Sequence, residues 1–283
     1  MSPVSAKDLY RCLILRLSEI GAVSPVGDAR LIIEHIADIG TMTDILTVDM
    51  SIDDEKLEIV EGILEERKNG RPVQYIIGWT NFYGRRFEIT DGVFIPRFET
   101  EVLVRRAIEI LGDGEGKSIV DVCCGAGAIA ITVAFETNAE CFAVDIDRTA
   151  VEIARTNKWL HGMEKRVSIW QGNLLTGIKE DVKFDLVLSN PPYIKAVDME
   201  NLPAEVRYEK LHALHGGENG FDLIKRITAE SRKHLIEGGS LLMEFGGEMP
   251  DGFDAFISDC GFKLRDILKD LSGRDRVLEL DVI

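Results

Sequence analysis

The feature that most constrains the fold of this chain is an alternation of short apolar segments with amphipathic segments after Pro96. The short segments are rich in Val, Ile, Leu and Phe and have the length of β-strands, while the segments between the first three, and the one before the last, have the helical period. Five strands are expected in this region, at 118–122, 141–145, 167–171, 184–189 and 240–244. The alternation predicts an α/β fold, a parallel sheet that helices cover on both faces.

Two further apolar segments, 262–267 and 276–280, are joined by a short link that contains Gly273. A link of this length cannot hold a crossover helix, so the two segments are expected to form an antiparallel pair that completes a seven-stranded sheet.

The first 78 residues have a different pattern, with apolar residues at helical spacing from Leu9 to Ile20 and again from Ile32 to Ala37. Ser51, followed by Asp54, resembles a capping box that opens a third helix, which Gly70 and Pro72 end. This part predicts a small helical bundle whose role is packing or binding.

Between residues 82 and 95 the period shifts to that of strands, with a turn expected at Asp91-Gly92. This stretch predicts a β-hairpin that connects two domains. The sequence therefore predicts three parts: a helical domain at 1–78, a hairpin connector at 79–95, and an α/β domain at 96–283.

The charge balance bears on the kind of substrate. The chain has 33 Lys and Arg against 49 Asp and Glu, a formal net charge of −16 and a sequence pI of about 4.8. Proteins that bind nucleic acid usually present a basic face to the phosphates. The balance therefore disfavours an RNA or DNA substrate, although a local basic patch would be compatible with it.

The five cysteines form no Cys-x-x-Cys pair, which is typical of reduced thiols in the cytoplasm. No stretch approaches the roughly 18 apolar residues that span a bilayer, and no signal peptide is visible. A cytoplasmic protein without a membrane partner is therefore expected. No grouping of side chains with the spacing of metal ligands is present either, so no metal is expected.

A glycine-rich turn follows the first predicted strand, with Gly125-Ala126-Gly127 between that strand and a helix. Asp145, at the end of the next strand, can accept the hydroxyl protons of a ribose. The same pattern fits a dinucleotide site. Asp121 favours S-adenosylmethionine instead, because a carboxylate near the loop suits a cationic amine, whereas a pyrophosphate needs an uncharged helix N-terminus.

The fourth predicted strand ends in the sequence Asn190-Pro191-Pro192-Tyr193. The two prolines fix the backbone and remove two donors, so the preceding carbonyls stay free. The Asn190 oxygen and the Pro191 carbonyl can accept both protons of a planar amide, while the Tyr193 ring stacks on its face. Such a site holds an amide nitrogen for attack on a sulfonium methyl group, a displacement that needs no metal and no covalent intermediate.

These motifs resemble the PrmC/HemK family, the protein-(glutamine N5) methyltransferases of peptide chain release factors. The Asn-Pro-Pro-Tyr sequence is typical of methyltransferases that act on planar nitrogens, and further segments narrow the resemblance to this family over essentially the whole chain. These segments are 71–78 (RPVQYIIG), 94–101 (FIPRFETE), 205–209 with 213–214, 238–239 with Glu244, and 273–277.

The resemblance implies a class I S-adenosylmethionine-dependent methyltransferase, Rossmann-like, with an N-terminal helical bundle and a connecting hairpin. It implies that the target is the glutamine of the Gly-Gly-Gln loop of a release factor, gripped in part by the helical domain, and we expect a monomer. The catalytic residues would be Asn190, Pro191 and Tyr193, and Pro192 would complete the substrate site. Together with Asp121, the cofactor-binding residues would be Cys123, Cys124, Gly125, Ala126, Gly127, Asp145, Asn173, Leu174 and Asn190.

Four positions depart from the usual family pattern: Cys123 replaces Gly, Phe98 and Lys210 replace Pro, and Asn173 replaces Asp. Altered cofactor contacts are expected at Cys123. Three alternative functions stay open: a glutamine methyltransferase of a ribosomal protein, a nucleic-acid amino-methyltransferase, and a non-catalytic release-factor-binding module.

Overall fold

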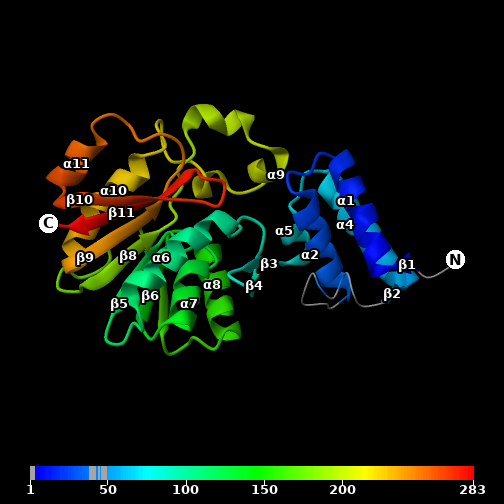
Figure 1. Ribbon diagram of the computed structural model, residues 1–283, viewed down its shortest axis with the longest axis horizontal. Coiled ribbons are helices and arrows are strands. Elements are labelled where there is room, and N and C mark those ends of the chain that lie inside the picture. The colour runs from blue at the N-terminus through cyan, green and yellow to red at the C-terminus, as the bar shows by residue number, and fades with distance from the viewer. Residues whose placement is uncertain (1–3, 38–42, 44, 46–49) are drawn as a thin grey trace. The chain divides into compact units, whose positions relative to one another are not determined.

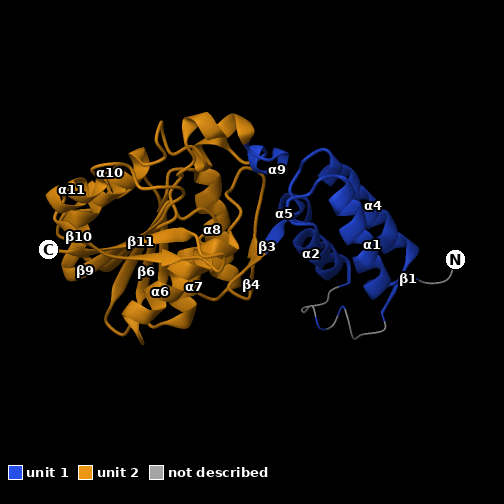
Figure 2. Cartoon of the chain, turned by 45° about the horizontal axis from the view of Figure 1, so that its top comes forward, with its two compact units in different colours: residues 1–80, 202–208 blue, residues 81–201, 209–283 orange. Residues whose placement is uncertain are grey.

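The computed structural model describes residues 4–37, 43, 45 and 50–283, which form two compact units (Figure 2). Unit 1 contains the described residues up to Thr80 together with 202–208, and unit 2 contains 81–201 and 209–283. In sequence, residues 202–208 interrupt unit 2, but they pack as part of unit 1. No helix in the described ranges is both long and apolar enough to cross a membrane.

Unit 1 is built from helices around one apolar core, with a two-stranded antiparallel sheet at its edge. Its elements are β1 (Val4–Ser5), α1 (Ala6–Glu19), α2 (Pro25–Ala37), β2 (Ser51–Ile52), α4 (Asp54–Lys68), α5 (Val73–Ile77) and α9 (Ala204–Arg207).

The N-cap of α4 differs from the capping box that the sequence predicts at Ser51. Asp53, not Ser51, is the N-cap residue, and its carboxylate accepts a hydrogen bond from the backbone N–H of Lys56 at 2.9 Å. Ser51 lies in β2, paired with Ser5. An aspartate directly before the helix satisfies a free N–H at its start, which leaves Ser51 no role there.

The hairpin forms, but its turn lies earlier than the sequence predicts. Strands β3 (Trp79–Phe82) and β4 (Arg85–Glu88) are joined at Tyr83-Gly84, whose φ angles are +50° and +71°. A tight two-residue hairpin turn requires left-handed backbone at both positions, which Gly84 adopts freely and Tyr83 tolerates. Asp91-Gly92 forms a separate turn after β4, with no strand following it.

The seven strands of unit 2 form one sheet in the order β10-β11-β9-β8-β5-β6-β7, as the sequence predicts in number (Figure 1). Strands β5 to β9 run parallel, and β11 is antiparallel to both of its neighbours. The strands are β5 (Ser118–Val122), β6 (Glu140–Asp145), β7 (Val167–Gln171), β8 (Phe184–Ser189), β9 (Leu235–Glu244), β10 (Phe262–Lys269) and β11 (Asp275–Val282).

Alternate residues of each strand point to opposite faces of the sheet, and two apolar cores result. Ile119 lies in the core beneath α6, α7 and α8, while Val120 lies in the core beneath α10 and α11. The helices of this unit are α6 (Glu101–Leu111), α7 (Ala128–Glu136), α8 (Arg148–Leu160), α10 (Asp222–Ser231) and α11 (Phe253–Asp259), with 3-10 turns η1 (Phe98–Thr100), η2 (Ala196–Asn201), η3 (Leu211–Ala213) and η4 (Arg232–His234).

Candidate active site

The candidate site lies where the strand order of the sheet reverses. The chain continues from β5 to β6 on one side and later places β8 on the other, with Val122 opposite Ser189. The loops that follow β5 and β8 therefore leave the sheet side by side at its carboxyl edge, which is where open α/β sheets bind ligands. The glycine loop and the Asn190-Pro191-Pro192-Tyr193 loop are thus brought together, as the sequence predicts.

The glycine loop is shaped by left-handed backbone at Cys123, Gly125 and Gly127, with φ of +63°, +53° and +80°. A Cβ at Gly127 would lie 3.1 Å from the side chain of Ala154, so this glycine lets α7 and α8 approach closely. A Cβ at Gly125 would meet only Phe94, at 3.9 Å. The space over Gly125 is therefore open to a ligand.

Asp145 joins the glycine loop to the end of β6. Its carboxylate accepts hydrogen bonds from the backbone N–H of Gly125 at 2.8 Å and of Asp147 at 2.9 Å. Burial raises the pKa of Asp145, and these two donors oppose the rise. Each carboxylate oxygen retains acceptor capacity that the hydroxyls of a ribose can use.

Asp121 is fully buried at the end of β5, and one of its oxygens lacks a partner. Oδ2 accepts a hydrogen bond from the backbone N–H of Ala130 at 3.2 Å, while Oδ1 has no hydrogen bond to any described residue. Burial raises the pKa of Asp121 well above 3.8, and the charge of Asp145 adds to the rise. A cationic amine close by would compensate this lone oxygen, so the site fits the amino group of S-adenosylmethionine.

The remaining predicted cofactor residues differ in what they expose. The side chains of Cys124, Ala126 and Leu174 are buried, so these residues can offer a ligand only their backbone. Asn173 is exposed, with its Oδ1 3.5 Å from Arg226. Ile146, to which the sequence analysis gave no role, directly follows Asp145 and is 60% exposed.

Asn190 belongs to a hydrogen-bonded chain of polar side chains in unit 2, in which Thr100 and Glu244 are buried and Asn190 and Tyr193 are half-buried. Its Nδ2 donates to Thr100 Oγ1 at 3.0 Å, and that hydroxyl donates to Glu244 Oε2 at 2.6 Å. Tyr193 donates its phenol proton to Glu244 Oε1 at 3.0 Å. We refer to Thr100, Asn190, Tyr193 and Glu244 as the amide network.

The backbone after Asn190 is clamped by a glycine-rich segment. The backbone N–H of Gly216 donates to the Ile194 carbonyl at 2.8 Å, and the N–H of Ile194 donates to the Leu214 carbonyl at 2.9 Å. A Cβ at Gly216 would lie 2.6 Å from Tyr193 Cα and 2.8 Å from the Pro192 carbonyl oxygen. No hydrogen bond joins Asn190 Oδ1 or the Pro191 carbonyl to another described residue. These two acceptors are therefore available to a substrate amide.

Thr100 and Glu244 stand in motifs that the sequence singled out, but sequence reasoning gave them no role. The available signal was a carboxylate at the end of the apolar strand β9, a position where an unpaired charge is costly. Among the described residues, no three His, Cys, Asp or Glu side chains are grouped as metal ligands would be.

Comparison with known proteins extends these observations. Residues 98–205 match the model of the methyltransferase small domain, and residues 8–78 match the PrmC N-terminal domain. The chain is 35% identical to a release factor glutamine methyltransferase of Clostridium botulinum, over 94% of each chain. It is 32% identical to a protein of the same name from Fusobacterium nucleatum, over 96% of this chain and 77% of that one.

The chain belongs to the release factor glutamine methyltransferase family. Its fold is similar to that of a ribosomal protein L11 methylase from Lactobacillus delbrueckii subsp. bulgaricus, with a TM-score of 0.50 and 18% identity over 69% of this chain and 83% of that one. The seven-stranded sheet is thus the class I methyltransferase fold expected from the sequence.

The structure shows the backbone conformation, partner or exposure of three residues that the sequence analysis singled out as departures from the family pattern. Cys123 has left-handed backbone, a conformation that glycine adopts without the cost a Cβ brings. Lys210 forms an ion pair with Asp147 at 2.7 Å, and Phe98 is 63% exposed.

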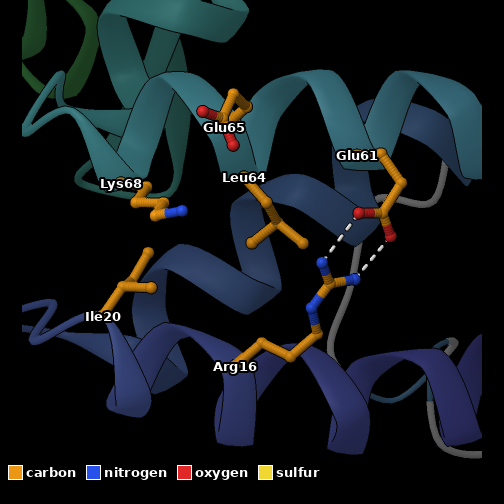
Figure 3. A pocket seen from close by; sticks show the side chains of 6 residues that line it. All are labelled: Arg16, Ile20, Glu61, Leu64, Glu65 and Lys68. Carbon is orange, nitrogen blue, oxygen red and sulfur yellow. Dashed lines mark hydrogen bonds and ion pairs between the residues drawn. The ribbon is translucent and has the colours of Figure 1, made fainter.

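Unit 1 contains a hollow between α1 and α4, and none of the predicted site residues lines it (Figure 3). The ion pair of Arg16 with Glu61 crosses it, and both side chains are substantially exposed. Its lining residues are Arg16, Ile20, Glu61, Leu64, Glu65 and Lys68.

Proposed function

We propose that this protein transfers a methyl group from S-adenosylmethionine to the side-chain amide nitrogen (N5) of the glutamine in the Gly-Gly-Gln motif of a peptide chain release factor. The observation that carries the proposal is the pair of free acceptors, Asn190 Oδ1 and the Pro191 carbonyl, beside the open glycine loop. The family relationship over nearly the whole chain supports the choice of substrate.

The cofactor would be held by unit 2 alone. Asp121 would face its amine, Asp145 its ribose, and Gly125 would let its backbone approach, while Ile146 would cover the adenine. When bound, S-adenosylmethionine supplies a methyl carbon made electrophilic by the sulfonium.

The chain's own contribution is positioning. An amide nitrogen is a poor nucleophile because its lone pair is delocalised into the carbonyl. Asn190 Oδ1 and the Pro191 carbonyl would accept hydrogen bonds from its two N–H groups and draw electron density toward the nitrogen, while the Tyr193 ring would support the plane of the amide. The transfer would convert one N–H bond into an N–CH₃ bond, with one proton lost from the nitrogen and S-adenosylhomocysteine as the leaving product. The rigid proline backbone fixes these groups in advance, which lowers the entropic part of the barrier.

We further propose that unit 1 contributes to gripping the release factor. The Asn190-Pro191-Pro192-Tyr193 loop is called the substrate loop from here on. Residues 202–208 follow it in sequence and pack within unit 1. There Glu205 pairs with the buried Arg67. A helical unit that holds part of the segment after the substrate loop is suited to recognising the protein that carries the glutamine.

The experiment that tests the function offers one methyl donor to competing acceptors. Purified protein and labelled S-adenosylmethionine are incubated with a release factor, the same factor with its Gly-Gly-Gln glutamine replaced by alanine, ribosomal proteins, and RNA. We expect label in the intact release factor alone. Label in ribosomal protein or RNA but not in release factor would overturn the proposal in favour of those substrates, and label in none would favour a binding module.

Variants of the two key side chains should separate chemistry from binding. Asn190→Ala removes an acceptor for the amide protons, so we expect turnover to fall by about two orders of magnitude while cofactor affinity is largely kept. Asp145→Ala removes the expected ribose contact, so it should mainly weaken cofactor affinity. Single-turnover kinetics and calorimetric titration measure the two effects, and near-normal turnover of Asn190→Ala would contradict the assigned role.

A further inference from the structure

We propose that Glu244 is a positioning residue, which acts through Thr100 to orient the Asn190 amide with its oxygen toward the substrate and, through the phenol of Tyr193, to hold the aromatic ring in place. This inference rests on the proposed function and deepens it, because it assigns a role to a buried carboxylate for which the proposed function names no contact with substrate or cofactor.

The orientation of Asn190 follows from the number of protons available. Thr100 has one hydroxyl proton, and the Glu244 carboxylate, which can only accept, lies 2.6 Å from that hydroxyl. A hydroxyl this close to a carboxylate donates to it. Thr100 Oγ1 can then only accept from Asn190, so the Asn190 NH₂ group faces Thr100. The Asn190 oxygen is thereby left free at the opposite end of the amide.

The second oxygen of Glu244 fixes the aromatic ring. Tyr193 donates to it at 3.0 Å, and a Cβ at Gly246 would lie 2.8 Å from the ring carbons of Tyr193. The ring is therefore held at its hydroxyl by the carboxylate and along its edge by the backbone after β9. One carboxylate at the end of β9 thus determines the arrangement of two groups that would contact the substrate amide.

The charges around Glu244 define the pH at which this arrangement holds. Burial raises the pKa of Glu244 above 4.5, Thr100, Tyr193 and Arg276 lower it, and Glu99 raises it. The pKa of Tyr193 is also raised by burial, so its phenol stays a donor. Only ionised Glu244 can accept from both hydroxyls, so turnover should fall as the pH drops through the pKa of Glu244.

Glu244→Gln is the direct test, since it keeps the shape and adds donors. The Gln amide must donate to Thr100 or to Tyr193, so one of the two hydroxyls loses its acceptor. We expect kcat for the release factor to fall at least about tenfold with cofactor affinity unchanged, and the fall of kcat at low pH that is expected of the wild type to be flattened.

A matched control separates this role from stability. Glu279→Gln changes another fully buried carboxylate of the same sheet, which pairs with Arg106 at 2.8 Å outside the amide network. It should lower the unfolding temperature without changing kcat or its pH profile. If Glu244→Gln and Glu279→Gln lower the unfolding temperature by the same amount and both have the kcat of the wild type, the inference is wrong.

Thr100 gives a second pair of variants if Glu244→Gln does not fold. Thr100→Val keeps the volume but removes the acceptor for Asn190, whereas Thr100→Ser keeps the hydroxyl. Thr100→Val should lower kcat, and Thr100→Ser should recover most of it. Equal kcat for the two variants would overturn the inference, whereas a wild-type protein that methylates no release factor would instead overturn the proposed function.

Discussion

Two residues of the glycine loop region hold unfavourable states that a bound ligand can explain. Cys123 adopts left-handed backbone, which costs a residue with a Cβ about 1–2 kcal/mol. Asp121 is fully buried with one oxygen unpaired. Such costs concentrate at functional sites, and here both lie where β5 ends beside the loop after β8.

The raised pKa of Asp121 gives a prediction with a definite sign. Because burial raises the pKa of Asp121 above the ordinary 3.8, the folded chain keeps a proton on this carboxyl that the unfolded chain releases at pH values between the two pKa values. The stability that this carboxyl contributes is present at low pH and is lost as the pH rises through its folded pKa. Asp121→Asn should therefore make the free energy of unfolding less dependent on pH and should weaken binding of S-adenosylmethionine.

Urea unfolding across a pH series measures the first effect, and calorimetry the second. The exposed Asp181→Asn is the control, and we expect it to change neither. An Asp121→Asn variant with the wild-type pH dependence would show that this carboxyl does not titrate as its burial implies.

At the scale of elements, the backbone conformation of the substrate loop is held by the segments that pack against it. The turn after β8 has no regular secondary structure until η2, yet its backbone is held by the bridge between Ile194 and His215 and by the close approach of Gly216. Asn157 of α8 performs a similar task behind the glycine loop, donating to the carbonyls of Glu88 and Ala126, both at 3.0 Å. The two loops of the site are thus fixed by other elements of the fold.

Gly216→Ala should disturb this loop. Its Cβ would meet the backbone of Tyr193 and Pro192 below 3 Å, and backbone cannot move aside as a flexible side chain can. We expect turnover to fall at least about tenfold, with cofactor affinity kept, because the glycine loop is not in the clash. Gly177→Ala, in the same unit with no atom within 4 Å of the new Cβ, is the control. Equal turnover in the two variants would disprove the clamp.

At the scale of the whole molecule, the two units have separate stabilising interactions. The candidate cofactor residues all lie in unit 2, whereas unit 1 contains a buried ion pair of Arg67 with Asp28 at 2.9 Å and a further contact with Glu205. Arg67 and Asp28 are each less than a tenth exposed. Removing the arginine would leave a buried carboxylate without its partner.

Arg67→Met should therefore destabilise unit 1 by about 3 kcal/mol and leave the affinity for S-adenosylmethionine unchanged. Trp79 lies in unit 1, so its fluorescence during urea unfolding, with Trp159 and Trp170 replaced by Phe, reports on that unit.

Arg16→Met breaks the exposed pair with Glu61 and should cost less than about 1 kcal/mol. If the two arginine variants had the same free energy of unfolding, the buried ion pair would stabilise unit 1 no more than the exposed pair does. A loss of cofactor affinity in Arg67→Met would show that the units are not independent in binding.

The sequence alone predicted the helical bundle, the seven strands, the glycine loop and the substrate loop, because each depends on local periodicity or on a few adjacent residues. It misplaced the hairpin turn and the N-cap of α4, because in each case the sequence offers two candidate sites. The hairpin turns at Tyr83-Gly84 rather than at Asp91-Gly92, and Asp53 rather than Ser51 is the N-cap of α4.

Only the tertiary structure joined Thr100, Asn190, Tyr193 and Glu244 into one network. These residues come from η1, the loop after β8 and the end of β9, and Thr100 and Glu244 are 144 positions apart. The pairing of β8 with β9 in a register that places Ser189 opposite Met243 makes the end of β9 a neighbour of the substrate loop. No local pattern encodes that neighbourhood, because it arises from the order in which the strands assemble.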